Sequence, residues 1–296
     1  MTGPIVVGVD GSDAALVALD WAADAARRLG LPLRAVYASL WERYEGAAPA
    51  SFGSARPEDA ALADWIVGST EARVHAHSPG LRVEAVALPQ DAGAALVAES
   101  RGAALVVTGV SGRGLITERL LGSVSLTLAG GAHCPSVVVR GEQPNVQGLY
   151  RRVVVGVHDP AQARPALRYA LREAAARRCE LQVVHAWRRV AQEPVDHMGV
   201  PGDTMRAQRD RVVHLLEEAV GIVVGGGGDV AVRRTAVEGP AHRVLTGLST
   251  EADLLVIGAS HQEHHHDQRR GPRVGHVAHA VLHRAACPVA IVHETG

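Results

Sequence analysis

The chain has 296 residues, of which 47% are hydrophobic and 21% are charged, a composition typical of a globular protein with two domains. Its formal net charge of −1 gives no basic field for a nucleic acid, and no apolar run is long enough to span a bilayer. All 30 residues counted as lysine or arginine are arginines, so a P-loop lysine, a Schiff-base lysine and a lysine general base are excluded.

The first half of the chain is predicted to alternate strands and helices. The continuous apolar run at residues 5–9 predicts a strand buried on both faces of a parallel sheet, and further strands are predicted at residues 33–38, 81–88, 103–109 and 135–140. Helical spacing and capping residues predict helices between them, at residues 12–30, 58–77, 92–101 and about 117–130. The order βαβαβαβαβ favours a doubly wound α/β sheet of five parallel strands with right-handed crossovers.

The second half repeats this pattern. VVVGV (153–157) repeats IVVGV (5–9), and AACPVAIV (285–292) repeats AHCPSVVV (132–139). We therefore expect two tandem Rossmann-like domains, residues 1–143 and 151–296. The polar stretch between them contains the helix breakers Pro144, Asn145 and Gly148. Each copy ends in an apolar strand, and because exposed edge strands seek partners, the two last strands are predicted to pair with each other.

The cysteine spacing and the first residues of the sequence indicate in which cellular compartment the protein is expected. Cys134, Cys179 and Cys287 form no CxxC pair, which indicates buried thiols rather than a disulfide framework or a zinc site, and no metal site is predicted. The start MTGPIVVGVDGSD lacks the features of a signal peptide. A cytoplasmic protein that interacts with neither membranes nor nucleic acid is expected.

Glycines are concentrated after the fourth predicted strand, with the spacing Gly109-x2-Gly112-x9-Gly122-Ser123. A loop of backbone N–H groups that leads into a helix N-terminus can cradle a phosphate, and glycines let its oxygens approach. Arg113 would supply the positive charge, and the Ser123 hydroxyl and the Val124 amide would donate hydrogen bonds. Asp10, at the end of the first strand, would accept from a ribose hydroxyl or help to hold Mg²⁺. The alternative is that these glycines only form turns and that Asp10 only caps a helix.

This motif, with Asp10, Ala38 and the closing strand CPSVVV, resembles the ATP-binding signature of the universal stress protein family, and the resemblance spans nearly all of both copies. It implies an ATP-binding stress-response protein, with Mg²⁺ and with Ala38 at the adenine and Gly8 beneath the nucleotide. It also implies a homodimer of the whole chain and an unidentified protein partner. The expected nucleotide-binding residues are Gly8, Asp10, Ala38, Gly109, Val110, Ser111, Gly112, Arg113, Gly114, Gly122, Ser123 and Val124.

The second copy departs from this motif. His261 replaces the second glycine, thirteen residues rather than nine precede Gly275, and His276 and His158 replace the serine and the aspartate. The corresponding second set, which defines a diverged site, is Gly156, His158, Ala186, Gly258, Gly275 and His276. The run His261–Asp267 offers imidazoles that suit transition metals, but adjacent side chains diverge, so a solvated loop is favoured over a metal site.

Three functions are compatible with these residues. The first is a regulatory protein that binds ATP and signals through its conformational state, because no nucleophile–base pair accompanies the phosphate loop. The second is a slow Mg²⁺-dependent ATP hydrolase that uses Asp10. The third is an interaction scaffold that binds no nucleotide. We expect the first, and therefore a protein without catalytic residues.

Overall fold

The computed structural model describes residues 3–39, 57–110, 121–188, 201–224, 229–259 and 274–293. The first copy consists of β1 (Ile5–Gly8), α1 (Asp13–Leu29), β2 (Leu33–Ala38), α2 (Pro57–His77), β3 (Val83–Leu88), α3 (Ala92–Glu99), β4 (Leu105–Gly109), α4 (Ser123–Gly131) and β5 (Ser136–Val139). The second copy consists of β6 (Arg152–Gly156), α6 (Arg164–Arg177), β7 (Glu180–Trp187), α7 (Pro201–Val224), β8 (Val232–Glu238), α8 (Ala241–Leu248), β9 (Leu254–Gly258), α9 (His276–Arg284) and β10 (Val289–Val292). The predicted alternation of strands and helices is confirmed in both copies.

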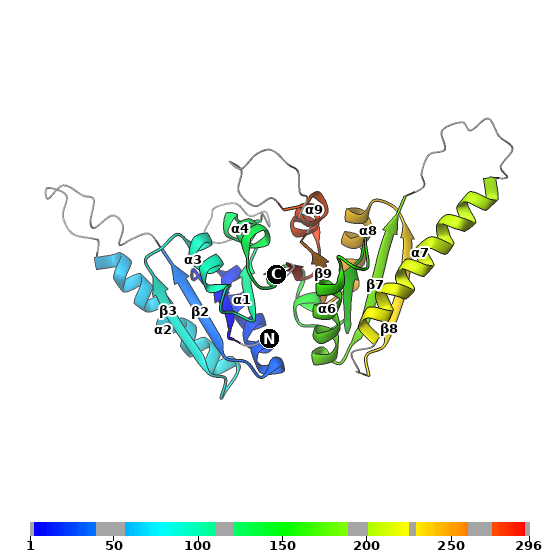
Figure 1. The fold of residues 1–296 in the computed structure, drawn as a ribbon. Coiled ribbons are helices and arrows are strands. Elements are labelled where there is room, and N and C mark those ends of the chain that lie inside the picture. Colours follow the sequence, from blue (N-terminus) through cyan, green and yellow to red (C-terminus); the bar gives the residue numbers. More distant parts are fainter. Residues whose placement is uncertain are drawn as a thin grey trace, which may run out of the picture.

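The strands of both copies form one ten-stranded sheet in the order β3-β2-β1-β4-β5-β10-β9-β6-β7-β8. Strands within a copy are parallel, and β5 and β10 pair antiparallel, with Ala290 opposite Val137. The predicted α/β fold and the pairing of the two last strands are therefore confirmed. Figure 1 shows the two halves side by side, with α2 and β3 at one outer flank and α7 and β8 at the other.

Helices cover both faces of the sheet because successive side chains of a buried strand point to opposite sides. Ile5 and Val7 of β1 pack in the apolar core beneath α1, whereas Val6 packs in a separate core with Leu96 of α3 and Leu128 of α4. The core beneath α1 continues into the second copy, where it includes residues of α6 and α7. The two copies thus share one core as well as one sheet.

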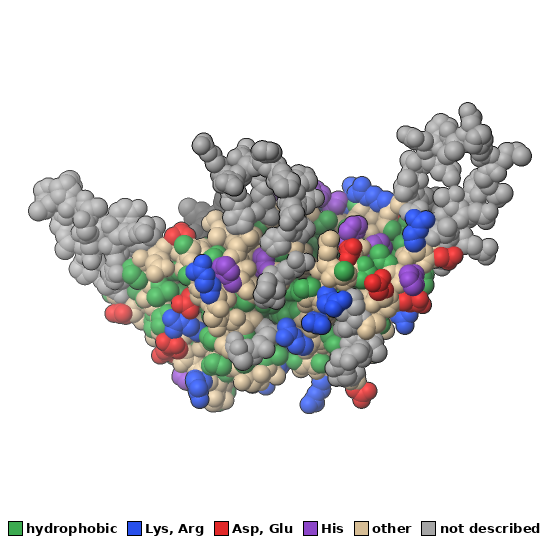
Figure 2. Space-filling model, in the orientation of Figure 1, with side chains coloured by type: hydrophobic (Ala, Val, Ile, Leu, Met, Phe, Trp, Pro, Cys, Tyr) green, Lys and Arg blue, Asp and Glu red, His purple; other side chains and the backbone are tan. Residues whose placement is uncertain are grey.

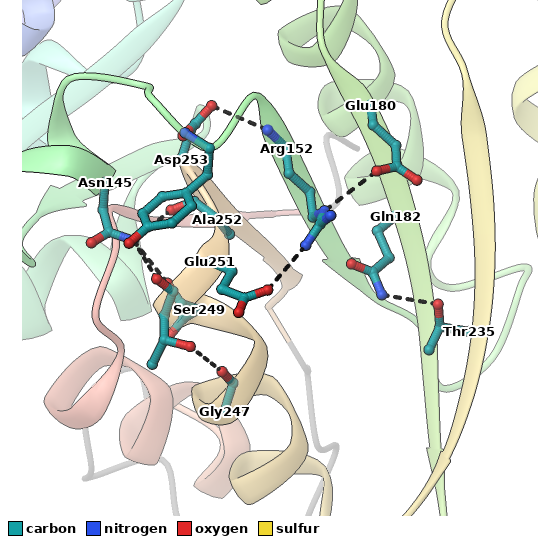
Figure 3. A network of polar contacts seen from close by, with 12 residues as sticks. Asn145, Arg152, Glu180, Gln182, Thr235, Gly247, Ser249, Glu251, Ala252 and Asp253 are labelled. Atoms are coloured by element: carbon teal, nitrogen blue, oxygen red, sulfur yellow. Dashed lines mark hydrogen bonds and ion pairs between the residues drawn. The ribbon is translucent and has the colours of Figure 1, made fainter.

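The connection between the copies contains the short helix α5 (Gln143–Val146), where the sequence predicted only helix breakers. Asn145 is 1% exposed, and its Nδ2 donates to three main-chain carbonyl oxygens at 2.9–3.2 Å. These carbonyls belong to Ser249, Thr250 and Ala252, in and just after the 3₁₀ helix η2 (Ser249–Glu251) (Figure 3). One buried amide therefore ties the connection to the second copy.

Asp253 fixes the point where the connection becomes β6. Its carboxylate accepts hydrogen bonds from the backbone amides of Tyr150 and Arg152 at 2.9 and 3.1 Å (Figure 3). Burial raises the pKa of this carboxyl group above its ordinary value, while these amide donors oppose the rise. The Arg152 side chain in turn lies 3.4 Å from the Glu180 carboxylate of β7.

One predicted boundary was wrong. The helix expected from about residue 117 begins instead at Ser123, because Gly122 is extended, with φ −71° and ψ 157°. Residues 117–120 lie outside the described part of the chain. Acidic and basic side chains are interspersed on the face shown in Figure 2, in keeping with the small net charge. Among the described helices, none has the length and apolarity needed to cross a membrane.

Candidate functional site

The ends of three neighbouring strands meet at one edge of the first copy. β1 lies between β2 and β4, and Gly8 at the end of β1 is level with Val36 of β2. The strand order reverses between β1 and β4, and such a switch point is where ligands bind in doubly wound sheets. The carboxyl ends of these strands carry Gly8, Asp10, Ala38, Gly109 and Val110. Because β1 and β4 are neighbours, Asp10 and Gly109 lie at the same edge of the sheet.

The N-terminus of α4 lies at the same edge. The Gly122 amide donates to the Val110 carbonyl oxygen at 2.8 Å, which holds the start of α4 beside the end of β4. Gly122 is the N-cap residue, and it has no side chain to accept from the first-turn amides. The N–H groups of Ser123 and Val124 belong to this first turn, where a helix attracts anions. Gly122, Ser123 and Val124 therefore join the strand-end residues, whereas Ser111, Gly112, Arg113 and Gly114 lie outside the described residues.

The glycines at this edge have different reasons to be glycine. A Cβ atom on Gly109 would lie 2.6 Å from the Ala14 carbonyl oxygen of α1, and a Cβ on Gly8 would lie 2.7 Å from a methyl group of Leu96. Both positions are thus constrained by the packing of helices on the sheet. Among the described residues, a Cβ on Gly122 would meet the Val110 oxygen alone, at an ordinary 3.5 Å. Packing within the described part of the chain therefore gives no reason for a glycine at position 122.

Asp10 closes the turn that leads into α1. Its Oδ1 accepts from the Ser12 amide at 2.9 Å, and Ser12 itself is the N-cap residue, with Oγ 3.2 Å from the Ala15 amide. The alternative that Asp10 caps the helix is therefore wrong in its detail, because Ser12 is the N-cap residue and Asp10 closes the turn before it. A carboxylate has two oxygens and several acceptor sites, so this turn is compatible with a second role for Asp10.

Two buried hydroxyl groups at this edge were not predicted from the sequence. The Ser125 Oγ, in α4, donates to the Gly109 carbonyl oxygen at 3.0 Å and lies 3.2 Å from the Thr108 Oγ1, at the end of β4. Thr108 is 5% exposed and Ser125 is 2% exposed. A polar residue at the end of an apolar run was the only signal in the sequence, and it did not identify the partner.

The second copy has the same edge with different side chains. Gly156, His158, Ala186, Gly258, Gly275 and His276 lie at the ends of β6, β7 and β9 and at the start of α9. The ring of His158 stacks 6.2 Å from that of His185, and the ring of His276 meets that of His242 edge-on at 5.4 Å. In Figure 2, histidine side chains gather over the part of this half where α8 and α9 lie.

Other features of this second edge also differ from the first. A Cβ on Gly258 would meet no described atom within 4 Å, unlike one on Gly109, whereas a Cβ on Gly156 would lie 2.9 Å from a methyl group of Leu245. Among the described residues, no three His, Cys, Asp or Glu side chains lie close enough together to bind one metal ion. The run His261–Asp267 lies outside the described residues, so the interpretation of that run as a solvated loop stays a prediction.

Neither the two open hollows of the structure described next nor the three cysteines belong to the strand-end edges of the two copies. Two open hollows of about 430 and 440 Å³ lie where strands begin, one beside Arg178 and Glu180 and the other beside Gly30 and Leu81. Burial raises the pKa of the Cys134 thiol to about 12, so this cysteine is inert at neutral pH. No disulfide joins Cys134, Cys179 and Cys287, which are all free.

Comparisons with known proteins cover both copies. The model of the universal stress protein family matches residues 1–140 and again residues 149–293. Universal stress protein Rv2623 of Mycobacterium tuberculosis H37Rv is 32% identical over 303 residues, which span 98% of this chain and 96% of that protein. A universal stress protein structure from Archaeoglobus fulgidus has a TM-score of 0.67 at 17% identity, covering 99% of this chain and 98% of its own. A universal stress protein solved in complex with cAMP covers 48% of this chain with a TM-score of 0.37.

Proposed function

The chain belongs to the universal stress protein family, and on that premise we propose that its first copy binds ATP and that the protein regulates a stress response. The nucleotide occupies the switch point between β1 and β4, and the bound state is recognised by a protein partner. The copies pair internally through β5 and β10, and a homodimer of whole chains is the proposed assembly.

The observation that carries this proposal is the start of α4. Its first-turn N–H groups, at Ser123 and Val124, stand at the switch point without a cap from the side chain of the N-cap residue Gly122, and no described atom lies closer than 3.5 Å to a Cβ built on Gly122. This arrangement fits a phosphate group, because helix N-termini stabilise negative charge and a glycine permits close approach. The hydroxyl of Ser123, an exposed side chain, is a further donor.

The remaining assignments follow from the family resemblance. Asp10 would accept from the ribose or bind Mg²⁺ through a water molecule, and the Ala38 main chain would contact the adenine. Bound Mg²⁺ supplies positive charge that offsets the charge of the phosphates. Arg113, in the motif between Gly112 and Gly114, would supply more.

We propose binding without turnover. Asp10 is the one carboxylate among the expected nucleotide-binding residues, and it already closes the turn before α1. Slow Mg²⁺-dependent hydrolysis is the alternative, and sustained phosphate release that Asp10→Asn abolishes would favour it. An interaction scaffold that binds no nucleotide is the other alternative.

The second copy is proposed to bind ATP weakly or not at all. His276 stands where the first copy has Ser123, and the ring of His276 lies against His242 beside the helix start. His158, in place of Asp10, removes the carboxylate that would hold Mg²⁺. A stoichiometry of about one nucleotide per chain follows from this difference.

Calorimetric titration of MgATP into wild type, Gly122→Ala and His276→Ala tests the proposal. The methyl group in Gly122→Ala occupies the space proposed for the phosphate without disturbing the protein, so binding should be lost while thermal stability is kept. His276→Ala is the matched control at the start of α9, and it should bind as wild type does. Absence of ATP binding by wild type would leave the scaffold as the function, and two sites per chain would contradict the proposed loss in the second copy.

A further inference from the structure

We propose that Thr108 and Ser125 are positioning residues that hold the phosphate-binding edge of the first copy in its binding geometry. We name this pair of hydroxyl groups the clasp. The inference rests on the proposed function, because it assigns the clasp to the same ATP site. Neither side chain is proposed to touch the nucleotide, since both are buried.

The clasp joins the end of β4 to the first turn of α4. Ser125 Oγ donates to the Gly109 carbonyl oxygen at 3.0 Å and lies within hydrogen-bond distance of Thr108 Oγ1. The Gly122 amide makes a parallel connection to Val110. Two hydrogen bonds, from the Gly122 amide and from the Ser125 hydroxyl, therefore join the start of α4 to the end of β4. The direction of the first-turn amides relative to the sheet is set by these bonds.

A buried hydroxyl group is costly unless it is hydrogen-bonded, so a hydroxyl pair is not what packing alone would select at this place. The second copy has apolar side chains at both of these positions. Ile257 occupies the place of Thr108 and Ala278 that of Ser125, and both lie in the apolar core of that copy at 5% exposure. Because β9 and α9 are formed there without the hydroxyl pair, the fold does not require the clasp.

Both helices have an N-cap glycine, Gly122 in α4 and Gly275 in α9, but the clasp is present in the copy where Ser123 follows that glycine and absent from the copy where His276 follows it. Hydrogen bonds are directional, whereas apolar contacts tolerate small rotations of a helix on its sheet. The clasp thus fixes the angle of α4, which a phosphate held by the Ser123 and Val124 amides would need. The second copy, with its diverged site, has no such requirement.

The test compares ATP with adenosine, which lacks the phosphates, in Thr108→Val and Ser125→Ala. Each variant should weaken ATP binding by about five- to ten-fold, the equivalent of one hydrogen bond of about 1 kcal/mol or slightly more, and leave adenosine binding unchanged. Thr108→Ser keeps the hydroxyl and should restore ATP binding. The matched control is Ser136→Ala, because Ser136 is equally buried at 2% exposure and its Oγ has no hydrogen-bond partner.

The outcomes separate the two proposals. If wild type does not bind ATP, the proposed function fails and the inference fails with it. If wild type binds ATP and the variants bind equally well, only the inference is overturned. An equal loss of ATP and adenosine binding also overturns it, because the clasp would then support the copy as a whole. If a single variant does not fold, the double variant Thr108→Ile with Ser125→Ala installs the apolar pair with which the second copy folds. Weaker ATP binding by this double variant supports the inference, and wild-type ATP affinity overturns it.

Discussion

The guanidinium carbon of Arg177, in α6, lies 5.3 Å from the centre of the Trp21 ring, in α1. The two residues belong to different copies, so this cation–π contact crosses the boundary that β5 and β10 bridge in the sheet. Arg177 also donates from Nε to the Glu173 carboxylate at 3.1 Å, and the two side chains are only 7% and 4% exposed. One guanidinium therefore packs against the first copy and neutralises a buried carboxylate of the second.

Arg177→Met should lower the free energy of unfolding by about 3 kcal/mol, because it leaves the Glu173 carboxylate buried without its counter-ion. Urea unfolding at pH 7 measures the loss. Adding Glu173→Met removes the uncompensated charge and should recover most of the stability. If the double variant is as unstable as Arg177→Met alone, the loss arises from the contact with Trp21 and the electrostatic explanation is wrong.

The last turn of α6 contains a strained residue. Arg178 has φ 54° and ψ 50°, a left-handed conformation, and its amide donates back to the carbonyls of the preceding turn. The corresponding residue after α1 is Gly30, with φ 66°. This conformation costs a non-glycine residue about 1 kcal/mol. Arg178→Gly should therefore raise the free energy of unfolding by up to about 1 kcal/mol. The gain is reduced by the conformational entropy that glycine adds to the unfolded chain.

Arg172→Gly, in the interior of the same helix, is the control for this effect. An exposed glycine there should cost about 1 kcal/mol relative to a good helix former, so the two glycine variants should shift the melting temperature in opposite directions. A fall in both would show that the Arg178 side chain makes a contribution that outweighs its backbone strain.

The stability of the second copy should fall on acidification because of His185. This histidine is 7% exposed, its Nδ1 lies 2.9 Å from the Val157 carbonyl oxygen, and burial lowers its pKa, with the nearby His158 acting in the same direction. The folded state then binds fewer protons than the unfolded state, so the stabilisation is present above the unfolded pKa of about 6.5 and is lost as the pH falls through the folded value. The urea midpoint should decrease from pH 7 to pH 5.

Tyr37 is the counterpart of His185 in the first copy, and it offers a non-titrating replacement that this fold already accommodates. In His185→Tyr the decrease between pH 7 and pH 5 should be smaller than in wild type. An unchanged pH dependence would assign the acid sensitivity to other histidines.

The order of strands and helices could be predicted because each signal is local. Continuous apolar runs identified β1 and β4, and the helix predicted at residues 12–30, with Ser12 or Asp13 as its cap and Gly30 as its stop, agrees with α1 and its caps Ser12 and Gly30. Asn145 was misinterpreted because the carbonyls that it binds are more than 100 residues away, and an asparagine in a polar stretch that contains proline and glycine indicates only a loop. The clasp was missed for the same reason, since Thr108 and Ser125 meet only when α4 folds back onto β4.

The glycine motif is a clearer example of what a sequence pattern cannot predict, because the pattern does not distinguish the structural roles of its glycines. Its spacing treats Gly109 and Gly122 alike, but a Cβ on Gly109 would clash with the Ala14 carbonyl oxygen at 2.6 Å, whereas among the described residues a Cβ on Gly122 would make only an ordinary contact with Val110. Gly109→Ala should therefore lower stability by about 1–3 kcal/mol through overpacking against α1, without any ligand present. Gly122→Ala should leave the melting temperature within about 1 °C of wild type, since a ΔΔG near zero shifts it little. Differential scanning calorimetry of both variants without nucleotide checks this. A loss of stability in Gly122→Ala equal to that in Gly109→Ala would mean that protein packing explains both glycines, and the space beside Gly122 would no longer indicate a phosphate.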